Sequence, residues 1–387
     1  MNAIGQRRAT SAVRHGVLLL AAIVAFVLAV PRLAAGQPDD AMVQITCQRR
    51  VVEGMPIRWT GDDIRLLGRD GRLWDFDLRA AATLRKTSDR FRPYSLSEFR
   101  AALLRELGGG YEVTGTAHYL VAHPRGQRDR WAERFEELYR SFARYFSVRG
   151  LRLATPRFPM VAVVSRDRAE FDQRMAAYGA LKCPALDEES LAATHSSGVD
   201  GYYRIDTNRI NLYDMGGKPD SARWQANASV LIHEATHQTA FNTGVHSRYA
   251  IPPRWLAEGL AMLFEAPGVY DSHNHPQLAD RVNREWLRVF RQSLAPRHRP
   301  ESLAAMVASD DLFRVNPSAA YAEAWAMSFF FVENEPAKYA RYLQRTATRP
   351  AFAAYSAAAR KADFTAIFGS DWRMLESRLL RYLAGLP

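Results

Sequence analysis

The sequence predicts an α+β protein, and three observations support this fold class. Residues 43–78 carry the alternation and turn signals of β-hairpins, residues 111–213 mix strands with helices, and the chain after Pro252 has helical periodicity alone. Strands that come first, followed by a run of helices, are typical of α+β proteins. With 387 residues, the chain is long enough for one large or two moderate domains.

The first elements predict a small β-rich module that ends in a helix. Residues 73–78 alternate between apolar and polar side chains, which places Trp74 and Phe76 on one face of a strand. Ser95 and Glu98 form a capping box, the S-x-x-E pattern that begins a helix. Three glycines at 108–110 end this helix, and we assign residues 37–110 to one accessory module.

The central elements predict a second sheet with helices beside it. Residues 119–122 and 160–164 are apolar and strand-like, aromatic residues at helical spacing mark 131–145 as a helix with a buried face, and residues 168–178 have a helical pattern. Residues 202–213 predict a hairpin that turns at 206–208. A long helix is expected from about Ser221 to Phe241, with Asp220 or Ser221 as its cap. Further helices are expected at 253–265, 277–293, 317–333, 336–345 and 371–385.

The N-terminal segment has the pattern of a secretory signal. Arg7, Arg8 and Arg14 precede an apolar run at 16–30, and small residues follow at 34–36. Cleavage after this run is one interpretation, and an uncleaved membrane anchor is the other. We therefore divide the chain into a signal or anchor (1–36), the accessory module (37–110), a catalytic domain (111–345) and a helical extension (346–387), and we expect a periplasmic or secreted protein.

Charge and cysteine content narrow the classes of partner. The formal charge is +11, but the basic residues are scattered among acids and form no stripe, so nucleic acid is not an expected partner. Membrane contact is expected only through an uncleaved N-terminal segment, and the oligomeric state is left open. Cys47 and Cys183 are the two cysteines of the chain, and in an oxidising compartment they either pair or remain two separate buried thiols.

The pentad His233-Glu234-Ala235-Thr236-His237 is the most specific motif of the chain. Two histidines four residues apart lie on one face of a helix, so both imidazoles can reach one metal ion. Glu234, beside the first histidine, can take a proton from a water that the metal activates. The bland alternative is a helix that carries polar residues, but the apolar residues at 230–232 predict a buried helix, where unpaired His and Glu are costly.

A third ligand is expected on the next helix. Glu258 lies twenty-one residues after His237, beyond a turn and a proline pair, and an antiparallel helix would return it to the pentad. Without the pentad, Glu258 would be an ordinary helix-surface acid. Zinc is the metal that a set of two imidazoles and one carboxylate favours, at one ion per chain.

The pentad followed by W-L-x-E-G-L-A at 255–261 resembles the gluzincin metallopeptidases. A closer resemblance is to a bacterial family of predicted peptidases known as domain of unknown function 1570, through the residues at 201–203, 208–214, 233–237, 242–244 and 255–265. This resemblance covers about 111–345. It implies a zincin-like catalytic domain with His233, His237 and Glu258 as zinc ligands and Glu234 as general base.

Two further residues have roles that the sequence leaves open. The thermolysin-type N-E-x-x-S-D pattern around the third ligand is absent, and Glu265, two turns beyond Glu258, is either a hydrogen-bond partner of a ligand imidazole or an acid at a helix end. Tyr321 is the candidate donor to the oxyanion, in analogy with other gluzincins, and a core tyrosine beside Trp325 is the alternative.

The predicted function is that of an exported zinc metallopeptidase that acts on peptides or proteins. One alternative keeps the zinc but changes the bond, as in an amidase of cell-wall peptides. The other is a non-catalytic binding protein with a vestigial site. By analogy with edge strands that bind peptides, the strand around Asn208–Tyr213 is expected to pair with an extended substrate.

Overall fold

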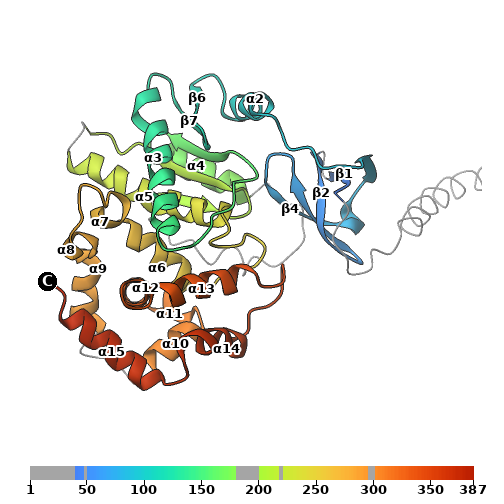
Figure 1. Ribbon diagram of the computed structural model, residues 1–387. Helices are drawn as coiled ribbons and strands as arrows, with labels where there is room; N and C mark the ends of the chain where they lie inside the picture. The colour runs from blue at the N-terminus through green and yellow to red at the C-terminus, as the bar shows by residue number, and fades with distance from the viewer. Residues whose placement is uncertain (1–39, 48–49, 180–199, 218–220, 295–300) are drawn as a thin grey trace, which may run out of the picture.

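The computed structural model describes residues 40–47, 50–179, 200–217, 221–294 and 301–387, and within them the fold is α+β, as predicted (Figure 1). A small N-terminal sheet comes first, a second sheet with flanking helices follows, and the chain ends in helices alone. The predicted signal segment and Cys183 lie outside the described residues, whereas Cys47 is buried and disulfide-bonded. None of the described helices is long and apolar enough to cross a bilayer.

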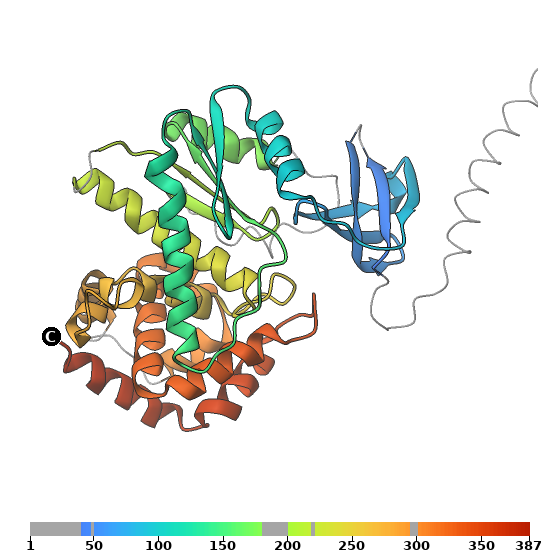
Figure 2. The same ribbon diagram turned by 45° about the horizontal axis from the view of Figure 1, so that its top comes forward.

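The N-terminal sheet is antiparallel throughout. Its strands have the spatial order β4-β3-β2-β1-β5, and they are β1 (Met42–Cys47), β2 (Arg50–Thr60), β3 (Asp63–Gly68), β4 (Leu73–Asp77) and β5 (Thr83–Ser88). β4 is the strand predicted from the alternation at 73–78: Phe76 is 2% exposed and Trp74 packs against the same core cluster. Figure 2 shows this sheet to one side of the helices of the C-terminal half.

Helix α2 (Leu96–Leu107) begins at the predicted capping box. The Ser95 side chain accepts from the backbone N–H of Glu98, and the Glu98 carboxylate accepts from the backbone N–H of Ser95. The sequence prediction assigned this helix to the accessory module, but its buried residues Phe99 and Leu103 pack against the second sheet. The apolar face of α2 therefore covers that sheet, and the capping box fixes only where the helix begins.

The second sheet is mixed and has the order β6-β7-β8-β10-β9. Its strands are β6 (Tyr111–Gly115), β7 (Tyr119–Pro124), β8 (Met160–Ser165), β9 (Gly201–Arg204) and β10 (Arg209–Tyr213), and β7, β8 and β10 are parallel. The predicted hairpin at 202–213 is confirmed as β9 and β10, with Asn208 at φ 57° in its turn. The expectation that the strand around Asn208–Tyr213 is a free edge is wrong, because β9 covers β10 and forms the edge itself.

Three helices belong to this sheet. Helix α3 (Arg128–Ser147) connects β7 to β8, α4 (Arg168–Gly179) follows β8, and α5 (Ala222–Asn242) follows the hairpin. The predicted aromatic face of α3 is buried in the main core together with one face of the sheet, whereas α2 covers the other face. Ser221 caps α5 by accepting from the backbone N–H of Trp224, as predicted.

The C-terminal half is helical, as expected, but more divided. Its helices are α6 (Arg254–Phe264), α7 (Pro267–Tyr270), α8 (Leu278–Arg281), α9 (Arg284–Val289), α10 (Ser302–Ala308), α11 (Asp311–Val315), α12 (Pro317–Asn334), α13 (Pro336–Ala347), α14 (Ala357–Phe368) and α15 (Trp372–Ala384), and a π-helical turn, η3 (Phe290–Leu294), follows α9. The single helix predicted at 277–293 is wrong, because Asn283 interrupts it and caps α9 by accepting from the backbone N–H of Trp286. Helices α7, α10, α11 and α14 were not predicted.

The two sheets are joined at the turn of the β9–β10 hairpin. The backbone N–H of Leu73 donates to the carbonyl oxygen of Asp206 at 2.7 Å. The Glu106 carboxylate on α2 accepts from Arg72, in the turn between β3 and β4, at 2.7 Å and from Arg209 in β10 at 2.8 Å. The N-terminal sheet therefore supports the hairpin whose edge strand, β9, lines the cleft described next.

Candidate metal centre

Helix α5 carries the pentad, and its geometry explains why both histidines face the same way. Residues four apart are stacked on one helix face, and the imidazole centroids of His233 and His237 lie 4.8 Å apart. The helix is buried around them, with Ala235 and Thr236 at most 1% exposed. The two histidine side chains keep limited access to solvent, at 20% and 12%.

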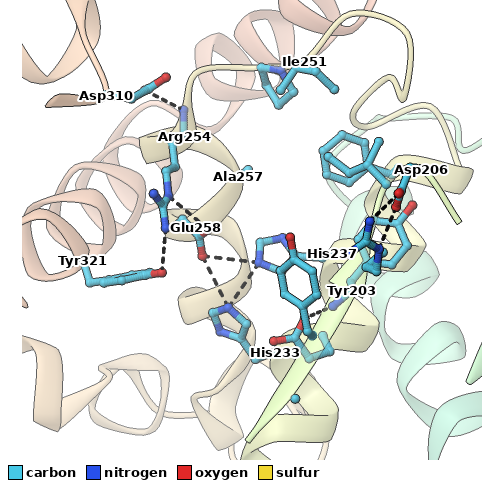
Figure 3. A pocket seen from close by; sticks show the side chains of 17 residues that line it. Tyr203, Asp206, His233, His237, Ile251, Arg254, Ala257, Glu258, Asp310 and Tyr321 are labelled. Carbon is cyan, nitrogen blue, oxygen red and sulfur yellow. Dashed lines mark hydrogen bonds and ion pairs between the residues drawn. The ribbon is translucent and has the colours of Figure 1, made fainter. Parts of the chain in front are cut away.

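Glu258 reaches the histidines from α6. The chain leaves α5 through Asn242, Thr243 and Gly244, the last at φ 83°, where a glycine avoids strain. It then returns in α6, which packs against α5. The Nε2 atoms of His233 and His237 lie 3.1 Å apart, and Oε2 of Glu258 lies 3.4 Å from the first and 3.3 Å from the second (Figure 3). The three predicted ligand residues thus converge on one point.

The close contact between α6 and α12 fixes the position of Glu258. A Cβ atom on Gly259 would lie 2.2 Å from Oγ of Ser328 and 2.4 Å from the carbonyl oxygen of Ala324, distances that a side chain cannot accommodate. Glycine at this position therefore permits the close contact between the two helices. Because Gly259 directly follows Glu258, this contact also sets where the carboxylate lies.

The electrostatics of the cluster are those of tightly coupled charges. Burial raises the pKa of Glu258, but the nearby His237 and His233 outweigh burial and hold that pKa below its usual range. Burial lowers the pKa of His233, and its hydrogen bonds to Glu258 and Glu265 more than offset this and raise it. Burial raises the pKa of Glu234. A carboxylate that stays ionised amid imidazoles is the state in which a cation can be bound.

Glu265 orients one of the imidazoles, which decides between the two interpretations of this residue. Its Oε1 lies 2.7 Å from Nδ1 of His233, on the side of the ring away from Glu258. Its Oε2 accepts from Nδ2 of Asn283 at 2.8 Å and from Nε1 of Trp286 at 3.3 Å. A carboxylate held in this way fixes the ring so that Nε2 faces Glu258.

Glu234 is held by the edge strand of the second sheet. The backbone N–H of Tyr203 in β9 donates to its Oε2 at 2.6 Å. The strand can approach α5 because position 201 is a glycine, where a Cβ would lie 2.3 Å from Cγ1 of Val230. Glu234 therefore points toward the same space as the three convergent groups but does not join them.

A cleft of about 180 Å³ opens in front of these groups. One wall is β9 and its turn (201–206), and the other is formed by α6 and α12. Tyr321 lines the cleft and is also half-buried against the main core, whereas its neighbour Trp325 is fully buried, at 0% exposed. The hydroxyl of Tyr321 accepts from Nη2 of Arg254 at 3.2 Å (Figure 3).

Several residues of the site were not found from the sequence. Asn283 and Trp286 lie in a stretch predicted as an unbroken helix, and no role was predicted for Arg254. The backbone N–H of Tyr203 carries no sequence signal at all. Only Arg254 had a sequence signal that could have been used. It lies four residues before Glu258, which places both side chains on one face of α6.

Comparison with known proteins finds a match to one family. A family described as "Protein of unknown function (DUF1570)" matches residues 227–353, which supports the resemblance to that family. The match includes the pentad, Glu258, Glu265 and Tyr321. It begins in α5 and leaves out both sheets, whereas the resemblance noted in the sequence begins near residue 111. No curated protein matches the chain.

Proposed function

We propose that this protein is an exported, zinc-dependent metallopeptidase with a zincin-like catalytic domain, and that His233, His237 and Glu258 hold the metal. The spacing of their donor atoms carries the proposal. Tetrahedral ligands about 2.0–2.1 Å from a zinc ion lie about 3.3 Å from one another, and the three separations here are 3.1, 3.3 and 3.4 Å.

The chemistry of the donor set also fits a metal ion. Three lone-pair donors converge here, and a single proton can bridge only two of them, so a cation at their centre satisfies all three. Three protein ligands leave a coordination position for water or substrate, as catalytic zinc sites require. The signal-like segment at 7–30, in which basic residues precede an apolar run, supports export.

The residues around the centre have separate tasks in hydrolysis. A zinc ion supplies Lewis acidity, which lowers the pKa of water and polarises a carbonyl oxygen. Glu234, whose raised pKa suits proton transfer, takes a proton from the attacking water and delivers it to the leaving amine. Tyr321 donates a hydrogen bond to the oxygen on which negative charge develops. Glu265 keeps His233 oriented throughout.

The cleft suits an extended peptide. β9 is the edge strand of its sheet and forms one wall of the cleft along 201–204. An extended chain can add to such an edge through main-chain hydrogen bonds. The apolar side chains of Phe241, Ile251 and Pro252 line the same space and offer contact to substrate side chains.

Metal content and hydrolysis together test the proposal. The purified protein is expected to carry about one zinc per chain, and His233→Ala and Glu258→Ala are expected to lose most of it. Glu234→Gln should keep the zinc and lower peptide hydrolysis by about 10²–10⁴-fold, since it removes the general base alone. Substoichiometric zinc in the wild type, or a Glu234→Gln variant as active as the wild type on casein, would refute the proposal. Hydrolysis of purified sacculi but not of casein would indicate the cell-wall amidase instead.

A further inference from the structure

Arg254 connects a proposed metal ligand to the proposed oxyanion donor. Its Nε lies 3.6 Å from Oε1 of Glu258, the oxygen that does not face the imidazoles. Its Nη2 donates to the hydroxyl of Tyr321 at 3.2 Å. The guanidinium lies over the ring of Phe313, 4.6 Å from the centroid. These contacts place Arg254 between two elements of the site that are 63 residues apart in the chain.

The position of Arg254 is fixed by a hydrogen bond at the start of α6. Its backbone N–H, at the start of α6, donates to Oδ1 of Asp310 at 3.0 Å. The other oxygen of Asp310 accepts from Nη2 of Arg360 at 2.7 Å. The Arg254 side chain is 16% exposed and leaves this anchored turn on the face that carries Glu258.

The ring of Tyr321 is equally constrained. Trp286 stacks on it, with centroids 5.8 Å apart and planes at 29°, and Phe313 meets it edge-on at 5.3 Å. Trp286 also donates to Glu265, the residue that orients His233. The phenol can therefore change little except for rotation of its O–H bond.

The chemistry of the Arg254–Tyr321 contact decides where that O–H points. A guanidinium has donors and no acceptor, and it stays protonated in proteins. The phenol oxygen must therefore accept from Arg254, and its own hydrogen is turned away from Arg254. Tyr321 and Arg254 both line the cleft, so a hydroxyl hydrogen that is turned away from Arg254 can point to an acceptor bound in the cleft.

We propose that Arg254 is a positioning residue that makes Tyr321 a hydrogen-bond donor toward the cleft, where it meets the oxygen of the substrate that gains charge. The inference rests on the proposed function for the identity of that oxygen. Arg254 also lines the cleft, but the role proposed for it is exercised through Tyr321. Removing Arg254 is therefore expected to matter only while the tyrosine hydroxyl is present.

A purely structural role for Arg254 makes a different prediction. If Arg254 only supported Glu258 and the start of α6, its loss would lower zinc content and stability, and it would add to the effect of losing the Tyr321 hydroxyl. Coupling between the two residues therefore distinguishes a positioning role from a structural one.

The test is a double-mutant cycle of Arg254→Gln and Tyr321→Phe in the full chain. The first measurement is the affinity of acetohydroxamate for the cobalt-substituted protein, followed in the visible spectrum, because this binding does not require hydrolysis. Each single variant is expected to weaken it by about 3- to 10-fold, which is the value of one hydrogen bond, and the double variant no further. Arg254→Lys, which keeps a cationic donor, is expected to recover part of the loss. Arg314→Gln, at an exposed position of α11, is the control for loss of an arginine.

The second measurement is peptide hydrolysis. Both single variants are expected to lower kcat by about 10²-fold with KM little changed, and zinc content should stay at the wild-type level. Additive losses in the double variant, or zinc loss in Arg254→Gln that accounts for its defect, would overturn the inference. Coupled hydroxamate binding in a protein that hydrolyses no peptide would support the positioning role and would contradict the proposed peptidase function.

Discussion

Glu323 provides a test of the structure that does not involve the metal. It lies on α12, two residues after Tyr321, and is 5% exposed. Burial, and then the charge of Glu376 on α15, raise its pKa to about 7. Glu376 is held in place because its carboxylate accepts from the backbone N–H groups of Glu301 and Leu303, both at 2.9 Å.

The direction and size of the effect follow from linkage. Between the ordinary pKa of 4.5 and about 7, the folded protein keeps a proton on Glu323 that the unfolded chain has released. The free energy of unfolding must therefore fall as the pH rises through this window. Each tenfold change in proton affinity is worth about 1.4 kcal/mol, so the difference between the two pKa values amounts to about 3 kcal/mol.

The assay is urea unfolding of the wild type and of Glu323→Gln between pH 4.5 and pH 8. The amide keeps the shape of the protonated acid but does not titrate. The difference in the free energy of unfolding between variant and wild type therefore removes the contributions of all other titrating groups. The stability of the variant relative to the wild type is expected to increase by about 3 kcal/mol across this range. Glu285→Gln, at an exposed position of α9, is the matched control for the substitution. A flat difference for Glu323→Gln would refute the burial of an uncompensated carboxyl in α12.

Two further predictions concern the residues that support the proposed metal centre. Glu265→Gln is expected to weaken zinc binding by about 10–100-fold, measured by competition with a chelating dye, since the amide no longer holds Nδ1 of His233 as a carboxylate does; unchanged affinity would contradict the orienting role. Gly259→Ala is expected to lower the free energy of unfolding by about 1–3 kcal/mol in urea, because its Cβ would overlap Ser328 and the carbonyl oxygen of Ala324. A variant as stable as the wild type would show that α6 and α12 can separate at little cost.

The features that could be predicted from the sequence are those with local causes. The four-residue spacing of His233 and His237 fixes their common face through helix geometry alone. Ser95 with Glu98, and Ser221, satisfy backbone groups within a few residues of themselves, and so each marked its helix start correctly. The prediction for Glu258 also succeeded in placing it, because a turn and an antiparallel helix limit where the chain can return.

The features that failed depend on contacts between distant segments. Asn283 breaks a helical pattern at the point where its amide reaches Glu265, a contact that no local periodicity contains. The order of β9 and β10 follows from which of them pairs with β8, a long-range contact that no local pattern contains.

The sequence by itself determined the α+β class and the chemical set of the site, because periodicity and motif spacing are properties of neighbouring residues. Only the tertiary structure decided that Tyr321 faces the cleft and that Arg254 donates to it, since that pair spans 67 residues. Packing of α6 against α12, which needs a glycine at position 259, brings Arg254 and Tyr321 together.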